Sequence, residues 1–98
     1  MFVGTLTFDL LLGDVHSLKE KRSIVRPIVA ELQRKYSVCA AETGSQELHR
    51  RAEIGLAVVS GEAGFVSEVL DGCERLVSGR PEVQLLAARR RLRDDEDE

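Results

Sequence analysis

The residues of this chain best suited to chemistry form the run His16-Ser17-Leu18-Lys19-Glu20-Lys21-Arg22, which is typical of a helix start. Ser17 and Glu20 have the spacing of a capping box. The serine oxygen can accept from the N–H of Glu20, and the carboxylate from the N–H of Ser17. Three bases crowd the first turns, where the helix dipole disfavours cations. Because a helix start also binds anions, the run predicts an anion or phosphate site, with a solvated basic face as the alternative.

Basic residues elsewhere extend this candidate surface. On a helical wheel, Lys19, Arg22 and Arg26 lie within about 60° of one another and form one basic stripe. Two arginines precede a later strand, and others crowd the end of the last strand. The predicted nucleic-acid or anion-binding residues are His16, Ser17, Lys19, Lys21, Arg22, Arg26, Arg50, Arg51, Arg89, Arg90 and Arg91. The alternative is that these charges are merely solvated.

Lys21 differs from its neighbours because the same wheel places it inside the apolar arc of the helix. An unpaired buried ammonium is costly, so we predict an ion pair with a carboxylate of the sheet. Glu42 and Glu53 are the candidates, and we favour Glu42 because it would point toward the helices. Two alternatives stay open. The ammonium could reach water past its own methylenes, or a kink at Pro27 could rotate the first helical turns.

Overall composition predicts one soluble domain over residues 1–93. The net charge is −3, but five of the 17 acids are residues 94–98, so the remainder carries 12 acids against 14 bases. We expect 94–98 to be a disordered acidic tail. No apolar run is long enough to span a bilayer, and no leader segment is evident. Cys39 and Cys73 lack CxxC spacing, and both are expected to be reduced, buried, small apolar residues of a cytoplasmic protein.

Hydrophobic periodicity predicts a strand-helix-strand-strand-helix-strand order. The expected strands are 2–12, 38–43, 52–60 and 83–92, and the expected helices begin near Ser17 and Ser60. Right-handed crossovers then place both helices on one face of a four-stranded antiparallel sheet, with the first and third strands central. The sequence therefore predicts an α+β protein with a ferredoxin-like β-α-β-β-α-β sandwich.

The other face of this sheet is predicted to be small and apolar. Its expected members are Val3, Thr5, Thr7, Cys39, Ala41, Gly55, Ala57, Val59, Leu86 and Ala88. Such a face favours a partner, and a homodimer through the open sheet face is the simplest one. The alternative is a face partly shielded by Arg and Gln side chains.

Signatures of catalysis and of metal binding are weak. Acylphosphatases share this topology but need an arginine in a phosphate-binding loop and an asparagine, and the chain contains no Asn. Neither HxxxH nor CxxC spacing occurs. We expect no enzymatic activity, no metal and no cofactor. Aromatic residues are also few, so any nucleic-acid binding should be directed at the backbone and depend steeply on salt.

Four segments resemble the bacterial YlxP-like family of small uncharacterised proteins. They are residues 1–12 (MFVGTLTFDLLL), the run His16–Arg22, the acid of Val38–Glu42, and the block Arg51–Ser60 (RAEIGLAVVS). The similarity spans about residues 1–90 and implies a ferredoxin-like fold. Two departures are the lack of an aromatic near His49, common in the family, and the tail 94–98.

The genes of this family commonly neighbour those for ribosome maturation and translation initiation. The resemblance therefore implies a role at the small ribosomal subunit or its rRNA. Together with the weak signatures of catalysis, it leads us to expect a cytoplasmic, non-enzymatic accessory protein. Two alternatives remain. One is a ligand-sensing regulatory module of the ACT type, with Gly13 in its first loop. The other is a protein–protein adaptor that uses the open sheet face.

Overall fold

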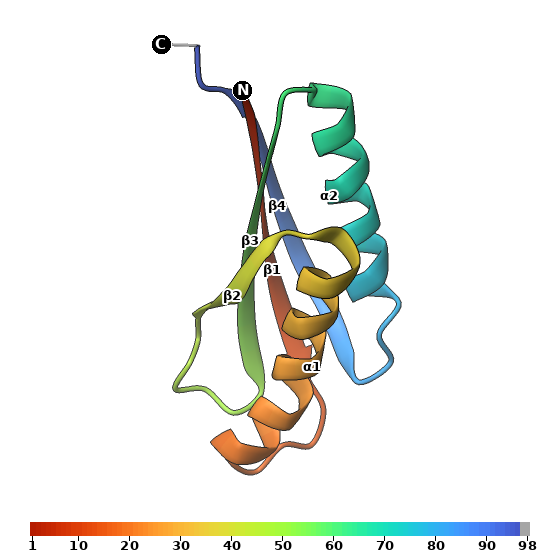
Figure 1. Cartoon of the computed structure of the whole chain (residues 1–98). Coiled ribbons are helices and arrows are strands. Elements are labelled where there is room, and N and C mark those ends of the chain that lie inside the picture. Colours follow the sequence, from red (N-terminus) through yellow and green to blue (C-terminus); the bar gives the residue numbers. More distant parts are fainter. Residues whose placement is uncertain (97–98) are drawn as a thin grey trace.

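The computed structural model describes residues 1–96 and contains two helices and four strands in the predicted order (Figure 1). The elements are β1 (Phe2–Leu12), α1 (Leu18–Tyr36), β2 (Cys39–Gly44), β3 (Arg51–Ser60), α2 (Ala63–Ser78) and β4 (Val83–Asp94). The strands form one antiparallel sheet in the order β2-β3-β1-β4, and both helices cover one face of it. The ferredoxin-like prediction is confirmed.

The core lies between the helices and the sheet, as the strand alternation requires. In β1, Leu6, Phe8, Leu10 and Leu12 are buried, whereas the residues between them face the other side. Each side chain of an antiparallel strand points opposite to its neighbours, so one face of β1 meets the helices and the other stays open. β1 and β3 are the two most apolar strands, and they hold the two central positions of the sheet.

Local signals explain where α1 begins and ends. Ser17 Oγ accepts from the N–H of Glu20 at 3.1 Å, as the capping box predicts. The reciprocal contact differs from the prediction, because the Glu20 carboxylate accepts from the N–H of His16 at 3.2 Å rather than from that of Ser17. Ser37 ends the helix in a left-handed conformation (φ 53°) and donates its N–H to the carbonyl of Gln33. α1 is one helix on both sides of Pro27.

A glycine lets α2 lie close to the sheet. A Cβ atom on Gly4 in β1 would lie 2.4 Å from Val66 Cγ1 and 3.0 Å from Leu70 Cδ1 of α2. Only a residue without a side chain fits there, because two carbon atoms cannot approach so closely. α2 thus packs its buried face, which includes Val69, Cys73 and Val77, directly against the strands.

The register of β4 corrects part of the predicted open face. Asp9 lies opposite Ala87, but Leu10 lies opposite Leu85, so Leu86 is an extra residue in a β-bulge. Ala88 therefore lies opposite the buried Phe8, on the helix side, and its predicted place on the open face is wrong. The open face instead carries alternate arginines of the last strand, which lie opposite Thr7, Thr5 and Val3: Arg89, Arg91 and Arg93.

The end of the described chain lies beside its beginning (Figure 1). β4 continues through Asp94, one residue beyond the domain boundary expected from the sequence. The N–H of Asp95 donates to the carbonyl of Met1, and its carboxylate lies 3.0 Å from the Met1 amine. Asp97 and Glu98, which belong to the expected acidic tail, lie outside the described residues. No helix within residues 1–96 is long and apolar enough to cross a membrane.

Candidate nucleic-acid interface

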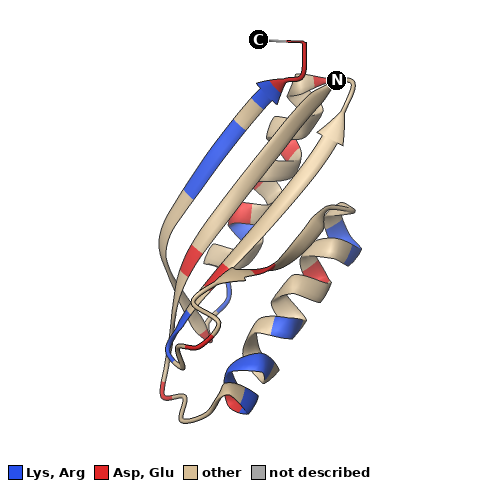
Figure 2. Ribbon diagram, turned by 90° about the vertical axis from the view of Figure 1, so that its left-hand side faces the viewer, with Lys and Arg blue, Asp and Glu red and all other residues tan. Residues whose placement is uncertain are grey.

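The outer surface of α1 gathers three of the predicted basic residues. Lys19, Arg22 and Arg26 are all exposed, and together with Ser23 and Pro27 they line a shallow hollow of about 350 Å³. Basic residues recur along the outside of this helix in Figure 2. Within residues 1–96, no carboxylate lies within 4.0 Å of these three cations. Their charge is therefore directed at solvent, where an anion can approach it. We call these three residues the α1 basic surface.

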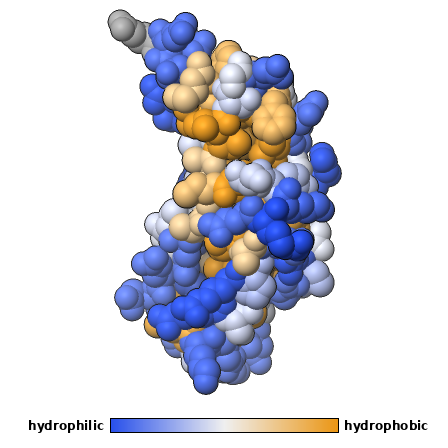
Figure 3. Space-filling view, viewed as in Figure 1, coloured by the Kyte–Doolittle hydropathy of each residue, from blue (hydrophilic) through white to orange (hydrophobic). Residues whose placement is uncertain are grey.

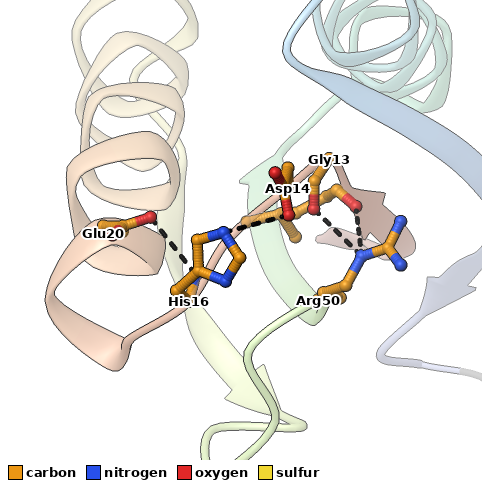
Figure 4. A network of polar contacts seen from close by, with 6 residues as sticks. Gly13, Asp14, His16, Glu20 and Arg50 are labelled. Carbon is orange, nitrogen blue, oxygen red and sulfur yellow. Dashed lines mark hydrogen bonds and ion pairs between the residues drawn. The ribbon is translucent and has the colours of Figure 1, made fainter.

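The start of α1 is occupied by the chain's own carboxylates (Figure 4). His16 Nε2 lies 3.1 Å from Asp14 Oδ1, and the backbone N–H of His16 donates to Glu20. Ser17 uses its hydroxyl to cap the helix. His16 and Ser17 thus have intramolecular partners, and negative side chains stand where an external anion would bind. The α1 basic surface, and not the helix start, is the better candidate for an anion site.

Lys21 lies in the interior, with 1 % of its surface exposed. Its Nζ is 2.9 Å from Glu42 Oε2 and donates to the Ser45 carbonyl at 2.5 Å. The predicted ion pair with Glu42 is confirmed. The contact is a close ion pair and not an aligned hydrogen bond, since Glu42 Oε2 is buried with no hydrogen bond of acceptable angle among the described residues. Lys21 joins α1 to the β2–β3 connection and is not accessible to a nucleic acid.

Arg50 also has a structural partner. Its Nε donates to the carbonyl of Gly13 at 3.0 Å and to that of Leu12 at 3.4 Å (Figure 4). It therefore fastens the β1–α1 loop to the start of β3. Arg51 follows on the open face, opposite Leu11, and is exposed. These two arginines are adjacent in sequence but have different surroundings.

The arginines of β4 separate because a strand alternates its side chains. On the open face, Arg89 lies 3.4 Å from Glu53 and 3.8 Å from Asp9. Arg90 points to the helix side and contacts two carboxylates of α2, Asp71 at 2.8 Å and Glu74 at 3.7 Å.

Two other arginines of this strand keep their charge free of acidic partners. Arg91 and Arg93 lie on the open face, and neither has an ion pair within residues 1–96. Arg93 was missing from the sequence-based set. The signal that could have included it is the alternation of a strand, which places Arg93 on the same face as Arg89 and Arg91.

The structure thus forms two basic groups and does not bring them together. The α1 basic surface belongs to the helix layer, whereas Arg89, Arg91 and Arg93 lie along one margin of the open sheet face. Between this margin and β2 the open face holds a shallow hollow of about 480 Å³. Small residues dominate its lining, among them Thr5, Thr7, Cys39, Ala41, Gly55 and Ala57. A homodimer through this face stays a prediction, now with arginines at its margin.

Neither cysteine belongs to a cluster that could hold a metal. Within residues 1–96, no group of three or more His, Cys, Asp or Glu side chains has a suitable arrangement. Cys73 is fully buried in α2, as predicted. The predicted burial of Cys39 is wrong, because Cys39 lies opposite Ala57 on the open face and is exposed. Burial raises the pKa of the Cys73 thiol to about 11. A neutral thiol at that position packs as a small apolar group.

The fold places this protein among those with a ferredoxin-like fold. A solved structure of a de novo designed protein with a ferredoxin fold is similar over 97% of this chain and 88% of that chain, with a TM-score of 0.54 and 14% identity. At that identity the likeness concerns the fold alone.

The chain belongs to the family described as "Protein of unknown function (DUF503)", whose model matches residues 3–90. It is also similar to "Uncharacterized protein YlxP" of Bacillus subtilis (strain 168). The two are 28% identical over 82 residues, which covers 84% of this chain and 89% of that relative. The family resemblance predicted from the sequence is confirmed.

Proposed function

We propose that this protein is a non-enzymatic accessory protein that binds RNA at its phosphate backbone, on the small ribosomal subunit or its rRNA. The observation that carries the proposal is the α1 basic surface. Its three cations surround one hollow and have no acidic partner within residues 1–96. Cations held on a rigid helix without neutralising carboxylates attract phosphate groups and release their counterions.

The placement of the aromatic residues supports backbone recognition over base stacking. Phe8 is fully buried in the core, and Tyr36 packs against Gly72 of α2. The open-face positions of the strands, by the register, are held by aliphatic, small, polar or charged residues. Sheets that read single-stranded RNA stack its bases on exposed aromatics, and these positions offer none. Binding through α1 cations is therefore the mode that this chain is equipped for.

The choice of the small ribosomal subunit rests on the family resemblance. Genes of YlxP-like proteins commonly neighbour genes for ribosome maturation and translation initiation, which favours a role near this RNA. The α1 basic surface supplies the physical means, because phosphate groups are the most abundant anions that a ribosomal surface displays.

Co-sedimentation with small ribosomal subunits tests the proposal. The protein should sediment with subunits at low salt and be released at moderate salt. The variant Lys19→Glu/Arg22→Glu/Arg26→Glu should stay in the supernatant while keeping the melting temperature of the parent. A control variant, Arg34→Glu/Lys35→Glu/Arg75→Glu, changes the net charge equally at other exposed sites and should still sediment. Equal sedimentation of both variants would remove the α1 basic surface from the account.

A further inference from the structure

The sheet has two edge strands, β2 and β4, which differ in length and in how well their outer backbone groups are shielded. β2 is short, spanning Cys39–Gly44, whereas β4 spans Val83–Asp94 and pairs only with β1 (Figure 1). An edge strand carries backbone N–H and C=O groups that can pair with another chain, so natural proteins usually shield it. The two edges of this sheet differ in how far this shielding goes.

At β2, side chains of the same protein already bind the backbone of the edge strand. Gln33 of α1 donates from Nε2 to the carbonyl of Ala40 at 2.9 Å, and Gln46 donates to the carbonyl of Glu42 at 3.2 Å. Two side-chain amides therefore already bind backbone carbonyls of this six-residue strand. Any added strand would have to displace them, so β2 is a poor acceptor.

At β4 no comparable contact exists among residues 1–96. No side chain donates to or accepts from a backbone group of 84–93, and the residues from Leu86 to Arg93 are all exposed. Leu92, on the helix side opposite Gly4, keeps 43 % of its surface accessible. Figure 3 shows hydrophobic residues at the surface in the upper part of the molecule. The longer edge is thus the accessible one.

The charges along β4 select the chemistry of a strand that could pair there. Arg89, Arg91 and Arg93 project on the open face at alternate positions, and the last two have no carboxylate partner within residues 1–96. Residues directly across an antiparallel pair interact, so acidic side chains at alternate positions of an added strand would face these arginines. The residues between them would face the helix side, where Ala88 and Leu92 offer apolar contacts.

The same charges disfavour a second copy of β4 in this place. A two-fold axis through the centre of the run would put Arg89 opposite Arg93 and Arg91 opposite itself, and like charges directly across a pair are destabilising. Arginines along an exposed edge thus discourage self-association. The same arginines attract a strand that carries acidic side chains.

We propose that the outer edge of β4 is a docking site for an extended acidic segment of a partner protein. The segment adds to the sheet as a fifth strand, with Asp or Glu at alternate positions over Arg89, Arg91 and Arg93. The site is separate from the α1 basic surface, so the proposal goes beyond the RNA-binding function and does not depend on it.

The test uses a short synthetic peptide of alternating glutamate and valine, labelled for fluorescence anisotropy. Wild-type protein should bind it, and the variant Arg91→Glu/Arg93→Glu should bind at least about tenfold more weakly because two facing charge pairs become repulsive. The control variant Arg34→Glu/Lys35→Glu makes the same charge change at exposed positions of α1 outside the α1 basic surface, and it should bind as the parent does. Amide hydrogen exchange at 84–93 should slow when the peptide is bound.

A second peptide separates strand addition from simple charge attraction. N-methylation of alternate backbone amides removes hydrogen bonding along one edge of the peptide and leaves its charges in place. The N-methylated peptide, with methyl groups on the edge facing the protein, should lose binding by at least about tenfold.

Three results would overturn the proposal. The first is equal binding of the methylated and unmethylated peptides. The second is equal weakening by the α1 control variant. The third is a loss of RNA binding by Arg91→Glu/Arg93→Glu without a loss of peptide binding, which would assign this edge to RNA.

Discussion

At the scale of single residues, Lys21 shows how one charge connects two parts of the fold. Its ammonium lies 2.9 Å from Glu42 and donates to the Ser45 carbonyl, so α1 is joined to β2 and to the turn that follows. The helical wheel predicted the burial of Lys21, and the alternation of the strand that carries Glu42 predicted its partner. This was possible because a lysine inside an apolar arc has few stable environments other than an ion pair.

Removing one partner of this pair should destabilise the protein. Lys21→Met leaves the Glu42 carboxylate without its cation, and we expect a loss of about 1–3 kcal/mol in the free energy of unfolding. The loss should be smaller than for a fully buried pair, because the Glu42 side chain is 22% exposed. Urea denaturation measures it. The double variant Lys21→Met/Glu42→Gln should recover part of the loss, and a Lys21→Met protein as stable as the parent would contradict the prediction.

The second residue-scale prediction concerns Cys73. Burial raises the pKa of its thiol from the ordinary 9.0 to about 11, while the positive charge of Arg90 acts in the opposite direction. The unfolded thiol ionises first, so the thiol's contribution to stability is complete below pH 9.0 and is lost as pH rises through about 11.

The free energy of unfolding should therefore fall more steeply with pH in this window for the parent than for Cys73→Ala. The difference in slope should be at most about 1.4 kcal/mol per pH unit. Denaturant titrations at a series of pH values measure both slopes, and parallel curves would refute the assignment. Native-state alkylation is an independent check, because exposed Cys39 should react well before Cys73.

At the scale of elements, the close packing of α2 on β1 depends on Gly4. Gly4→Ala would place a Cβ 2.4 Å from Val66 Cγ1, so α2 or the strand must shift, and we expect a loss of about 1–3 kcal/mol. Gly64→Ala is the matched control. It lies in α2 with nothing within 4 Å of its Cβ position, and the substitution should stabilise the helix by up to about 1 kcal/mol. Thermal unfolding compares the two, and equal effects would mean that the contact is not tight.

The sequence predicts the elements well and the register of β4 poorly. β1 alternates cleanly between large apolar and small or polar residues, which determines its buried face. The segment Leu85-Leu86-Ala87-Ala88 offers no such alternation, so nothing in it marks the bulge at Leu86. The next three residues, 89–91, are all arginine, so the sequence does not show which of them face the open side of the sheet.

The candidate site was predictable only where geometry follows from one helix. Lys19, Arg22 and Arg26 share a surface because of the helical repeat, which a sequence reveals directly. The roles of Arg50 and Arg90 depend on partners brought close by the tertiary fold. Arg50 binds carbonyls of the β1–α1 loop, and Arg90 binds Asp71 of α2. From the sequence alone, Arg50 and Arg90 cannot be distinguished from solvent-exposed bases, although both make intramolecular contacts in the structure.

At the scale of the whole molecule, the distribution of charge matters more than its total. The net charge of −3 would predict repulsion from RNA, yet the α1 basic surface gathers three cations that have no acidic partner among residues 1–96. Because a Debye length at physiological salt is only about 8 Å, local charge governs the approach of a phosphate group. Five of the 17 acids are residues 94–98. Of these, residues 94–96 lie at the opposite end of the molecule from the start of α1 (Figure 1).

The salt dependence of RNA binding tests the central claim most directly. The affinity of the parent for a generic single-stranded RNA is measured over a range of salt concentrations, beside that of Lys19→Gln/Arg22→Gln/Arg26→Gln. If the α1 basic surface contacts phosphates, the slope of log affinity against log salt should become shallower by roughly 2, because each lost contact on a single strand removes about 0.7. An unchanged slope in the variant, or no detectable binding by the parent at low salt, would contradict the account.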